Sequence, residues 1–516
     1  HQPFAEGEGD VDRVAPHILD HEAGGEVPGV FVGGWHILQS MTCRRRIEGA
    51  LEPGVALADR GCHRLTCQEA IVDNVTRERQ QYAGDLDHPK RLSLCAFGET
   101  RQVRRVIRTF AQGQSPEGWF MDCWPAWDRC QRLFQLHLGL TRWGPILDHA
   151  LEFGLAAADY FLWTADHALL GEITPKLERY ASFLARSAAA DGLLPVSGWT
   201  WNSVWIDHIG YQSEQDKRCA LNLYWAGFLS HGLARLQSWR GETAAARASR
   251  AKAAEIVQAV QARYWSEADS VYADNLPSLA PGGPLRAHAR TLSMALLFGQ
   301  IPPGREQRAV SLLAAIPSES VAGIHVFDNG RIELGFNYPL NEIWRLWALG
   351  RYGRADVVVK DLRQRWAAVP SVIENGTYGE FWTLQPSETG SVWCQSNPVP
   401  ALALYQILLG VRPAAPGFAD YEVRPQPGGL GRAAGVIYSP KGPIRVEVEG
   451  RDRGYGLRWQ SPPGAQAWLV TPAGARVSGL DAPLRFEPGS DPGTQRAMMP
   501  AGRRQQEWIL SVDNAG

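Results

Sequence analysis

The alternation of apolar and polar positions divides the chain into three stretches. Residues 1–55 contain short β-branched and aromatic pieces, such as Val30-Phe31-Val32, among glycines and acidic residues, without a sustained helical period. Apolar residues then recur at helical spacing, in segments of roughly 10 to 20 residues, up to about Gly410. Beyond that point, short alternating runs replace them. The pattern predicts a β-rich lead-in, a large helical part and a second β part.

Loops rich in Gly, Pro, Trp and Asp separate the predicted helices of the middle stretch. The clearest helical segments are residues 146–161, 177–190, 220–239, 243–264, 286–297, 305–314, 341–349 and 355–366. With weaker segments, they amount to about a dozen helices in hairpin-like pairs. Because the sequence lacks the fixed repeat length of a solenoid, we predict an (α/α)6 six-hairpin barrel over residues 56–412, with an irregular helical domain as the alternative.

Residues 413–516 are predicted to form a C-terminal β-sandwich. The stretch Arg412-Pro413-Ala414-Ala415-Pro416-Gly417 interrupts the helical pattern, because proline lacks the N–H group that a helix needs. Turns with Gly and Pro then separate short β-like runs at residues 421–423, 434–438, 444–448, 456–459, 467–470, 484–487 and 508–512. We therefore expect a mainly α chain with a lead-in over 1–55, a barrel over 56–412 and a sandwich over 413–516.

Charge and composition narrow the choice of partner. The formal net charge is -2, with 52 basic and 54 acidic residues mixed along the chain, which argues against the basic footprint of a nucleic-acid-binding protein. The chain has 20 tryptophans, several of them beside carboxylates. Indole faces stack well on sugars, although most such rings serve simply as core. A neutral partner with apolar faces fits this composition.

The cysteines and the hydropathy exclude other classes. Eight cysteines are scattered without CxxC pairs, so we expect buried, reduced thiols and neither a zinc site nor a disulfide scaffold. His88 and His208 lack the spacing of paired metal ligands, and we expect no metal and no cofactor. Because no apolar stretch is long enough for a membrane span or a leader, we expect a soluble protein, in the cytoplasm, the periplasm or, after leader removal, outside the cell.

Residues 73–85 hold an unusual density of charge. On one continuous helix, Asp73 and Arg77 would share a face while Glu78 would point away from Asp73, so a helix that breaks into a loop at Gly84 is needed to aim the carboxylates at one ligand. Cleavage of a glycoside needs a protonated carboxyl group, and a nearby like charge raises a carboxyl pKa. By itself, such a run is more typical of a salt-bridged surface.

The segment is similar to the active-site motif of bacterial α-L-rhamnosidases. In that motif an Asp precedes Arg-Glu, and an aromatic residue precedes Gly-Asp. The residues in register are Asp73, Arg77, Glu78, Tyr82, Gly84 and Asp85. The resemblance implies that Glu78 is the general acid and that Asp73, Arg77 and Asp85 bind sugar hydroxyls. Tyr82 stands where the family usually has Trp.

Later loops resemble the same family in the same order. Trp124-Pro125-Ala126-Trp127-Asp128 is similar to its Trp-rich loop, and residues 191–194 with 201–207 are similar to its "DGL…DW" stretch. Residues 408–427 resemble its passage from barrel to C-terminal sandwich. The resemblance implies that five further residues face the sugar, each with plain packing as the alternative: Trp127, Asp128, Trp205, Asp207 and Trp382.

An inverting hydrolase needs a second carboxylate to activate water. We predict Glu380, because it lies between Gly379 and Phe381-Trp382 where the family places its "Thr-x-Trp-Glu" base. The alignment slips by one residue there, so Glu374 and Glu388 stay as alternatives. Near Gln395 the chain also lacks a His that many family members carry. Because that His usually contacts the sugar or the base, the identity of the sugar stays open.

Together these motifs predict an exo-acting, inverting glycoside hydrolase that removes terminal α-L-rhamnosyl residues. The alternatives are a related barrel enzyme for another deoxy or uronic sugar, including a lyase, and a carbohydrate-binding homologue that has lost catalysis. We expect a carbohydrate partner and neither nucleic acid nor membrane, and a homo-oligomer is compatible with the sequence.

Overall fold

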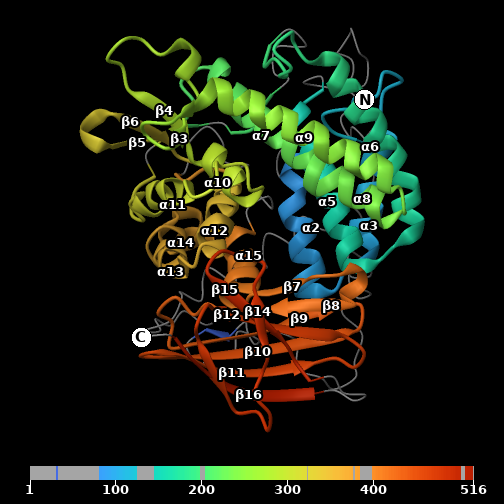
Figure 1. Cartoon of the computed structure of the whole chain (residues 1–516), viewed down its shortest axis with the longest axis vertical. Helices are drawn as coiled ribbons and strands as arrows, with labels where there is room; N and C mark the ends of the chain where they lie inside the picture. The colour runs from blue at the N-terminus through green and yellow to red at the C-terminus, as the bar shows by residue number, and fades with distance from the viewer. Residues whose placement is uncertain are drawn as a thin grey trace, which may run out of the picture.

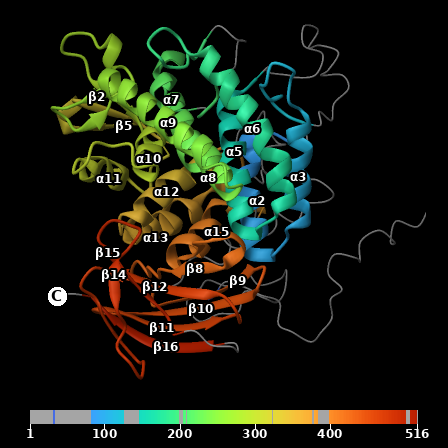
Figure 2. The same ribbon diagram turned by 45° about the vertical axis from the view of Figure 1, so that its right-hand side comes forward.

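The structure is a computed structural model of the whole chain. It describes residues 31–32, 81–124, 145–197, 204–207, 209–321, 323–375, 378–383, 398–500 and 506–514. Figure 1 shows a helical part, coloured blue to orange, above a β part in orange and red. Figure 2 shows the same division after a turn of 45° about the vertical axis.

Six helices of the helical part contact one another in a closed order. They are α2 (Ala83–Phe97), α5 (Leu147–Thr164), α7 (Lys217–Gly227), α10 (Ala289–Leu297), α12 (Glu342–Arg351) and α15 (Val399–Ala403). Each helix packs against the next in this order, and α15 packs back against α2. We call these six the ring helices. Their surfaces are buried nearly all round, as for α5, in which even Asp148 and Glu152 are buried.

The remaining helices of the described chain lie outside the ring, and several of them bury a single stripe. They are α3 (Arg101–Gln112), α6 (His167–Ser187), α8 (Ala234–Trp239), α9 (Thr243–Tyr264), α11 (Glu306–Ala315), α13 (Ala355–Gln364) and α14 (Pro370–Asn375). In α3, for example, Val103, Ile107 and Phe110 are buried, which is the spacing that one face of a helix requires. The outer position therefore explains the alternating polar pattern of these segments.

Two predicted helices differ from the observed elements. The segment 220–239 is interrupted by a π-helical stretch, Phe228–Leu233, between α7 and α8. The segment 286–297 begins as strand β4 (Leu285–His288), which pairs in parallel with β6 (Ile332–Gly335) in a small sheet completed by β5 (Ile324–Phe327). His288 ends the strand and caps α10, since its side chain accepts the N–H of Arg290. A short hairpin pairs β2 (Trp265–Ser266) with β3 (Val271–Tyr272).

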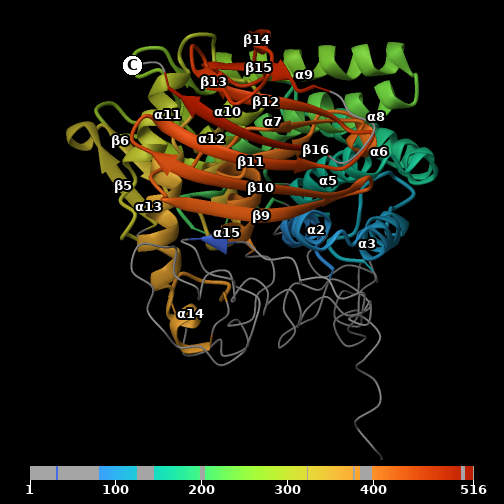
Figure 3. The same ribbon diagram turned by 90° about the horizontal axis from the view of Figure 1, so that it is seen from below.

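The β part consists of two sheets. The six-stranded sheet has the order β1-β9-β10-β11-β16-β13, from Phe31–Val32, Arg432–Ser439, Gly442–Arg451, Gly454–Ser461, Gln506–Asp513 and Arg476–Ser478. The five-stranded sheet has the order β14-β15-β12-β8-β7, from Phe486–Pro488, Thr494–Met498, Gln466–Pro472, Asp420–Val423 and Val411–Pro413. Strand β1 comes from the lead-in and pairs with β9. Figure 3 shows β9, β10, β11 and β16 crossing beneath the helices.

Aromatic packing joins the two sheets, and an ion-pair network joins them to the helices. Trp459 of one sheet donates its indole N–H to the hydroxyl of Tyr421 on the other at 3.0 Å. At the junction, the Asp491 carboxylate accepts hydrogen bonds from Arg412 and Arg424, each at 2.7 Å. The Arg424 guanidinium also donates to the carbonyl of Gly350 at the end of α12. The β part is therefore fixed to the ring through buried charge.

None of the helices in the described ranges combines the length and the apolar composition that a membrane crossing requires.

Candidate active site

The described part of the 73–85 segment begins where the helix α2 starts. Asp73, Arg77 and Glu78 lie outside the described residues, and so do Trp127 and Asp128. Tyr82 is buried and is the N-cap residue of α2, and Asp85 falls in the first turn of that helix. The end of the predicted motif therefore opens a ring helix.

The sequence analysis expected Gly84 to permit a turn where a helix breaks into a loop, and this prediction is wrong. Gly84 lies within the first turn of α2, and the positive-φ glycines of the described chain do not include it. A Cβ atom at Gly84 would stand 2.5 Å from Cδ2 of His149 on α5. Glycine is needed at this position because a histidine ring packs directly on the backbone of α2.

A row of aromatic rings runs from this point to the loop that carries Glu380. The centroid distances are 6.3 Å from Tyr82 to His149, 5.4 Å from His149 to Trp205, 6.3 Å from Trp205 to Tyr338 and 5.3 Å from Tyr338 to Phe381. All four contacts are edge-to-face, a favourable geometry for aromatic pairs. The row connects five segments that are distant in sequence, and the predicted residue Trp205 stands at its middle.

Glu380 occupies a buried loop beside the end of this row. Its exposed fraction is 8%. The loop is fixed on both sides, because the N–H of Gly379 donates to Ser371 Oγ at 2.9 Å and the indole of Trp382 donates to the carbonyl of Asn337 at 3.0 Å. The position of this carboxylate is therefore set by the fold around it. The structure describes the backbone of the alternative Glu374 at the end of α14, while Glu388 and Gln395 lie outside the described residues.

Trp382 is buried and packs among other aromatic side chains. Its ring stacks on Phe336 at 5.7 Å and meets Trp366 at 4.9 Å. The guanidinium of Arg365 lies over the ring of Phe336, 4.2 Å from its centroid. Behind them, Arg345 bridges the carboxylates of Glu342 and Asp361. Trp382 thus anchors the Glu380 loop to a buried, charged layer between α12 and α13.

Asp207 is buried and directs its carboxylate to protein groups. It accepts hydrogen bonds from the N–H of Ile209 at 3.1 Å, from the N–H of Tyr338 at 3.1 Å and from Nδ2 of Asn341 at 3.0 Å. Burial raises the pKa of this carboxyl to about 7 despite these bonds. Asp207 therefore holds the loop before α12 against its own loop. The neighbouring His208 lies outside the described residues.

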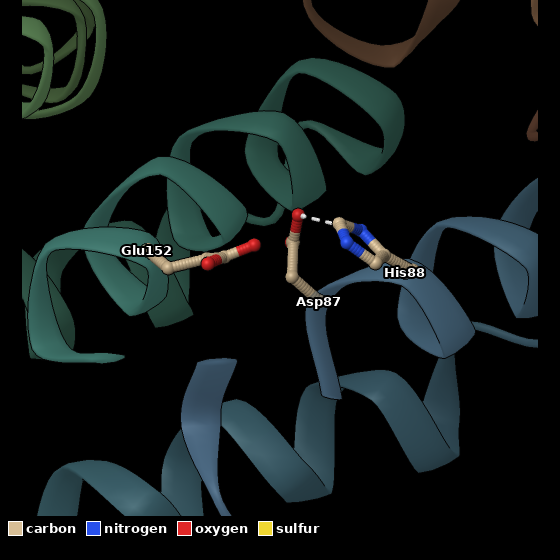
Figure 4. A group of neighbouring side chains, drawn as sticks. All are labelled: Asp87, His88 and Glu152. Atoms are coloured by element: carbon tan, nitrogen blue, oxygen red, sulfur yellow. Dashed lines mark ion pairs between the residues drawn. The ribbon is translucent and has the colours of Figure 1, made fainter. Parts of the chain in front are cut away.

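A cluster of three ionisable side chains, Asp87, His88 and Glu152, lies between α2 and α5 (Figure 4). The potential ligand atoms of these residues lie within 4.8 Å of one another, a spacing that a metal ion could use. Among the described residues, neither ring nitrogen of His88 has a hydrogen-bond partner. Burial lowers the pKa of His88 to about 3, so its imidazole is neutral.

Cations already balance the carboxylates of this cluster. Asp87 accepts a hydrogen bond from Arg91 Nε at 2.8 Å, and Glu152 lies 3.5 Å from Arg290 Nη2. Burial, opposed by the charge of Arg290, raises the pKa of Glu152 to about 7. A divalent cation would have to share the space with two guanidinium groups, so the arrangement fits an internal ion-pair cluster better than a metal centre.

Arg290 extends this cluster to the Asp207 loop. Its Nη1 donates to Asn341 Oδ1 at 2.6 Å, and Asn341 Nδ2 donates in turn to Asp207 and to the carbonyl of Ile206, at 3.0 and 2.7 Å. The guanidinium also lies over the ring of Trp344, 4.1 Å from its centroid. The sequence analysis did not identify Asp148, His149, Arg290 and Asn341 as residues of the candidate site. The signal that could have pointed to them is that each is a polar residue in a largely apolar helical segment.

Comparison with known proteins shows the family of the chain. The family model described as the bacterial alpha-L-rhamnosidase 6 hairpin glycosidase domain matches residues 58–326, which is more than half of the chain. The model of the bacterial alpha-L-rhamnosidase C-terminal domain matches residues 410–481. The comparison with curated protein sequences gave no significant match.

Solved structures share the fold at low sequence identity. A rhamnosidase of Bacillus sp. GL1 is 19% identical, with a TM-score of 0.61 over 82% of this chain and 40% of its own. The Streptomyces avermitilis α-L-rhamnosidase complexed with L-rhamnose is 18% identical, with a TM-score of 0.67 over 89% of this chain and 41% of its own. The enzyme from Aspergillus terreus is 16% identical, with a TM-score of 0.65 over 89% and 49%. The chain thus spans less than half the length of these relatives. On the extent of the family match, it belongs to the bacterial α-L-rhamnosidase six-hairpin glycosidase family.

Proposed function

We propose that the chain is an exo-acting, inverting glycoside hydrolase that removes terminal α-L-rhamnosyl residues. The observation that carries this proposal is the row of aromatic contacts from Tyr82, at the end of the family motif, to Phe381, next to Glu380. Within this row Trp205 and Phe381 are partly exposed, and such rings suit a pyranose, whose C–H faces pack on aromatic side chains.

We infer that the ring helices form the inner layer of an (α/α)6 barrel. Support comes from the closed order of their contacts and from the outer helices that pack around them. The candidate residues lie at or before the N-terminal ends of ring helices: Tyr82 before α2, Trp205 and Asp207 in the loops before α7, Tyr338 before α12 and Glu380 before α15. Loops at one end of a barrel are where its ligand site is expected. On this view residues 56–412 are the catalytic barrel, residues 413–516 the sandwich and residues 1–55 the lead-in.

In the proposed reaction, Glu78 donates its proton to the glycosidic oxygen as the bond from that oxygen to the anomeric carbon breaks. Glu380 takes a proton from a water molecule, whose oxygen bonds to the anomeric carbon on the opposite face. The product is the sugar with inverted anomeric configuration. Inversion requires the two carboxyl groups to stand about 6.5–9.5 Å apart. Asp73, Arg77, Asp85, Trp127, Asp128, Trp205, Asp207 and Trp382 shape or support the sugar site.

The test is turnover of an aryl α-L-rhamnoside, with NMR detection of the first anomer released. The wild type should release the β anomer, and Glu78→Gln and Glu380→Gln should each lower kcat by about 10²–10⁴. Near-normal turnover in either variant would refute that residue's role. Products that absorb as unsaturated uronates would indicate a lyase, and binding of L-rhamnose without turnover of any glycoside would indicate a binding protein.

A further inference from the structure

We propose that Asp148 is a positioning residue that holds Trp205 in place as a sugar-stacking platform. The inference rests on the proposed function, because it takes the ligand of the aromatic row to be a pyranose. Asp148 lies in the first turn of α5 and is 3% exposed. Trp205 is partly exposed, whereas its neighbours Val204, Ile206 and Asp207 are buried.

Both carboxylate oxygens of Asp148 bind the backbone of the Trp205 loop. Oδ1 accepts the N–H of Trp205 at 2.8 Å, and Oδ2 accepts the N–H of Ile206 at 2.7 Å. Two bonds from one rigid carboxylate to successive amides fix both the position and the direction of the backbone. Because α5 is a ring helix that is buried nearly all round, the packing of the ring holds this anchor in position.

The loop requires an anchor because its backbone is strained. Ile206 has a φ of 48°, a left-handed conformation that β-branched residues rarely adopt. The N–H of Asp207 closes a tight turn on the carbonyl of Trp205 at 2.5 Å, and Asn341 Nδ2 donates to the carbonyl of Ile206 at 2.7 Å. Without Asp148, Ile206 would relax toward an extended conformation and carry Trp205 away from its contacts with His149 and Tyr338.

The key experiment is a double-mutant cycle on kcat/KM for an aryl α-L-rhamnoside. Asp148→Asn keeps the size of the side chain but replaces one acceptor oxygen with an NH₂ group. It should lower kcat/KM about tenfold or more, the range for loss of a hydrogen bond to a charged group. If Asp148 acts through Trp205, the double variant should have nearly the same kcat/KM as Trp205→Ala alone. If instead the fold-losses of the two single variants multiply in the double variant, the proposal is overturned.

A second readout does not depend on catalysis. Hydrogen exchange at the amides of Trp205 and Ile206 should be faster in Asp148→Asn than in the wild type, and unchanged protection would overturn the proposal. The control is Asp166→Ala, beyond the opposite end of α5, where Asp166 accepts the N–H of Leu169 at 3.0 Å and pairs with Arg104. It should lower thermal stability without changing KM or exchange at residues 205 and 206.

The two proposals can fail separately. A wild type that cleaves no rhamnoside would refute the proposed function, and the cycle would then use the Kd for L-rhamnose. Coupling in that Kd would support Asp148 as the anchor of a sugar platform. Absence of L-rhamnose binding would overturn the platform as well.

Discussion

Two buried aspartates, one beside the ring and one at the junction with the β part, have opposite electrostatic surroundings. Asp207 accepts hydrogen bonds from the neutral N–H groups of Ile209, Tyr338 and Asn341, and burial raises its pKa to about 7. Asp491 is also buried, but the arginines around it, chiefly Arg412 and Arg424, outweigh burial and hold its pKa below the ordinary value. Burial is similar, so the neighbouring charges decide which protonation state the fold favours.

Removing Asp491 should give the largest loss of stability. Asp491→Ala would leave Arg412 and Arg424 without this shared partner, and breaking a buried ion pair on one side costs about 3–5 kcal/mol. Urea unfolding would measure the loss. Asp452→Ala, at an exposed residue near the same junction, is the control and should change the free energy of unfolding by less than about 0.5 kcal/mol. Equal effects in both variants would contradict a structural role for the network.

The pH dependence of stability should separate the two aspartates. The pKa of Asp207 is raised from 3.8 to about 7 on folding, so the folded chain holds this proton more tightly and stability falls as pH rises through this window. Asp207→Asn should therefore gain stability relative to the wild type by about 2 kcal/mol between pH 5 and pH 8. Glu152 titrates in the same pH range, but it is present in both proteins, so its contribution cancels when the stability of the wild type is subtracted from that of the variant.

Asp491 should behave in the opposite way. Its pKa is lowered, so the stability it contributes is present above the unfolded value of 3.8 and is lost as pH falls through the folded pKa. Asp491→Asn should consequently leave the slope between pH 5 and pH 8 unchanged. The assignment of the two pKa shifts would be contradicted if the stability difference between Asp207→Asn and the wild type did not change with pH. It would also be contradicted if Asp491→Asn changed the slope of stability against pH between pH 5 and pH 8.

Two helical glycines test the packing beside the aromatic row and, as a control, an open helix surface. Gly84→Ala places a methyl group against His149 and should destabilise the fold by about 1–3 kcal/mol, as overpacking does. Gly171→Ala, in the exposed part of α6 with open space around it, should stabilise by about 0.5–1 kcal/mol. Thermal unfolding of the pair would measure both. Two changes of the same sign would mean that His149 moves aside easily.

The elements were predictable where their pattern is local. The helix expected over 243–264 is α9, and the run expected over 444–448 lies within β10. In contrast, the strand β4 was predicted as helix, because its apolar residues gain their strand partners from β6, far along the chain. The period of apolar residues shows which face of a segment is buried, but it does not show which other segments pack against that face.

The candidate site shows the same limit more strongly. The tryptophans and carboxylates were recognisable because their loops resemble a family, and Trp205 and Glu380 do lie on or beside one aromatic row. The groups that hold them were not recognisable. Asp148 contacts backbone amides 57 and 58 residues away, and Arg290 reaches Asn341 across 51 residues. These roles depend on helix-to-helix proximity, which a single sequence does not reveal.

The contact between α15 and α2 has a consequence for how the chain is made. The first and last ring helices are separated by the residues from Phe97 to Val399, so the ring cannot close until almost the whole helical part has left the ribosome. At 5–20 residues per second this interval lasts roughly 15 to 60 s. During it, the apolar face of α2 that α15 later covers is exposed to solvent and to other nascent chains.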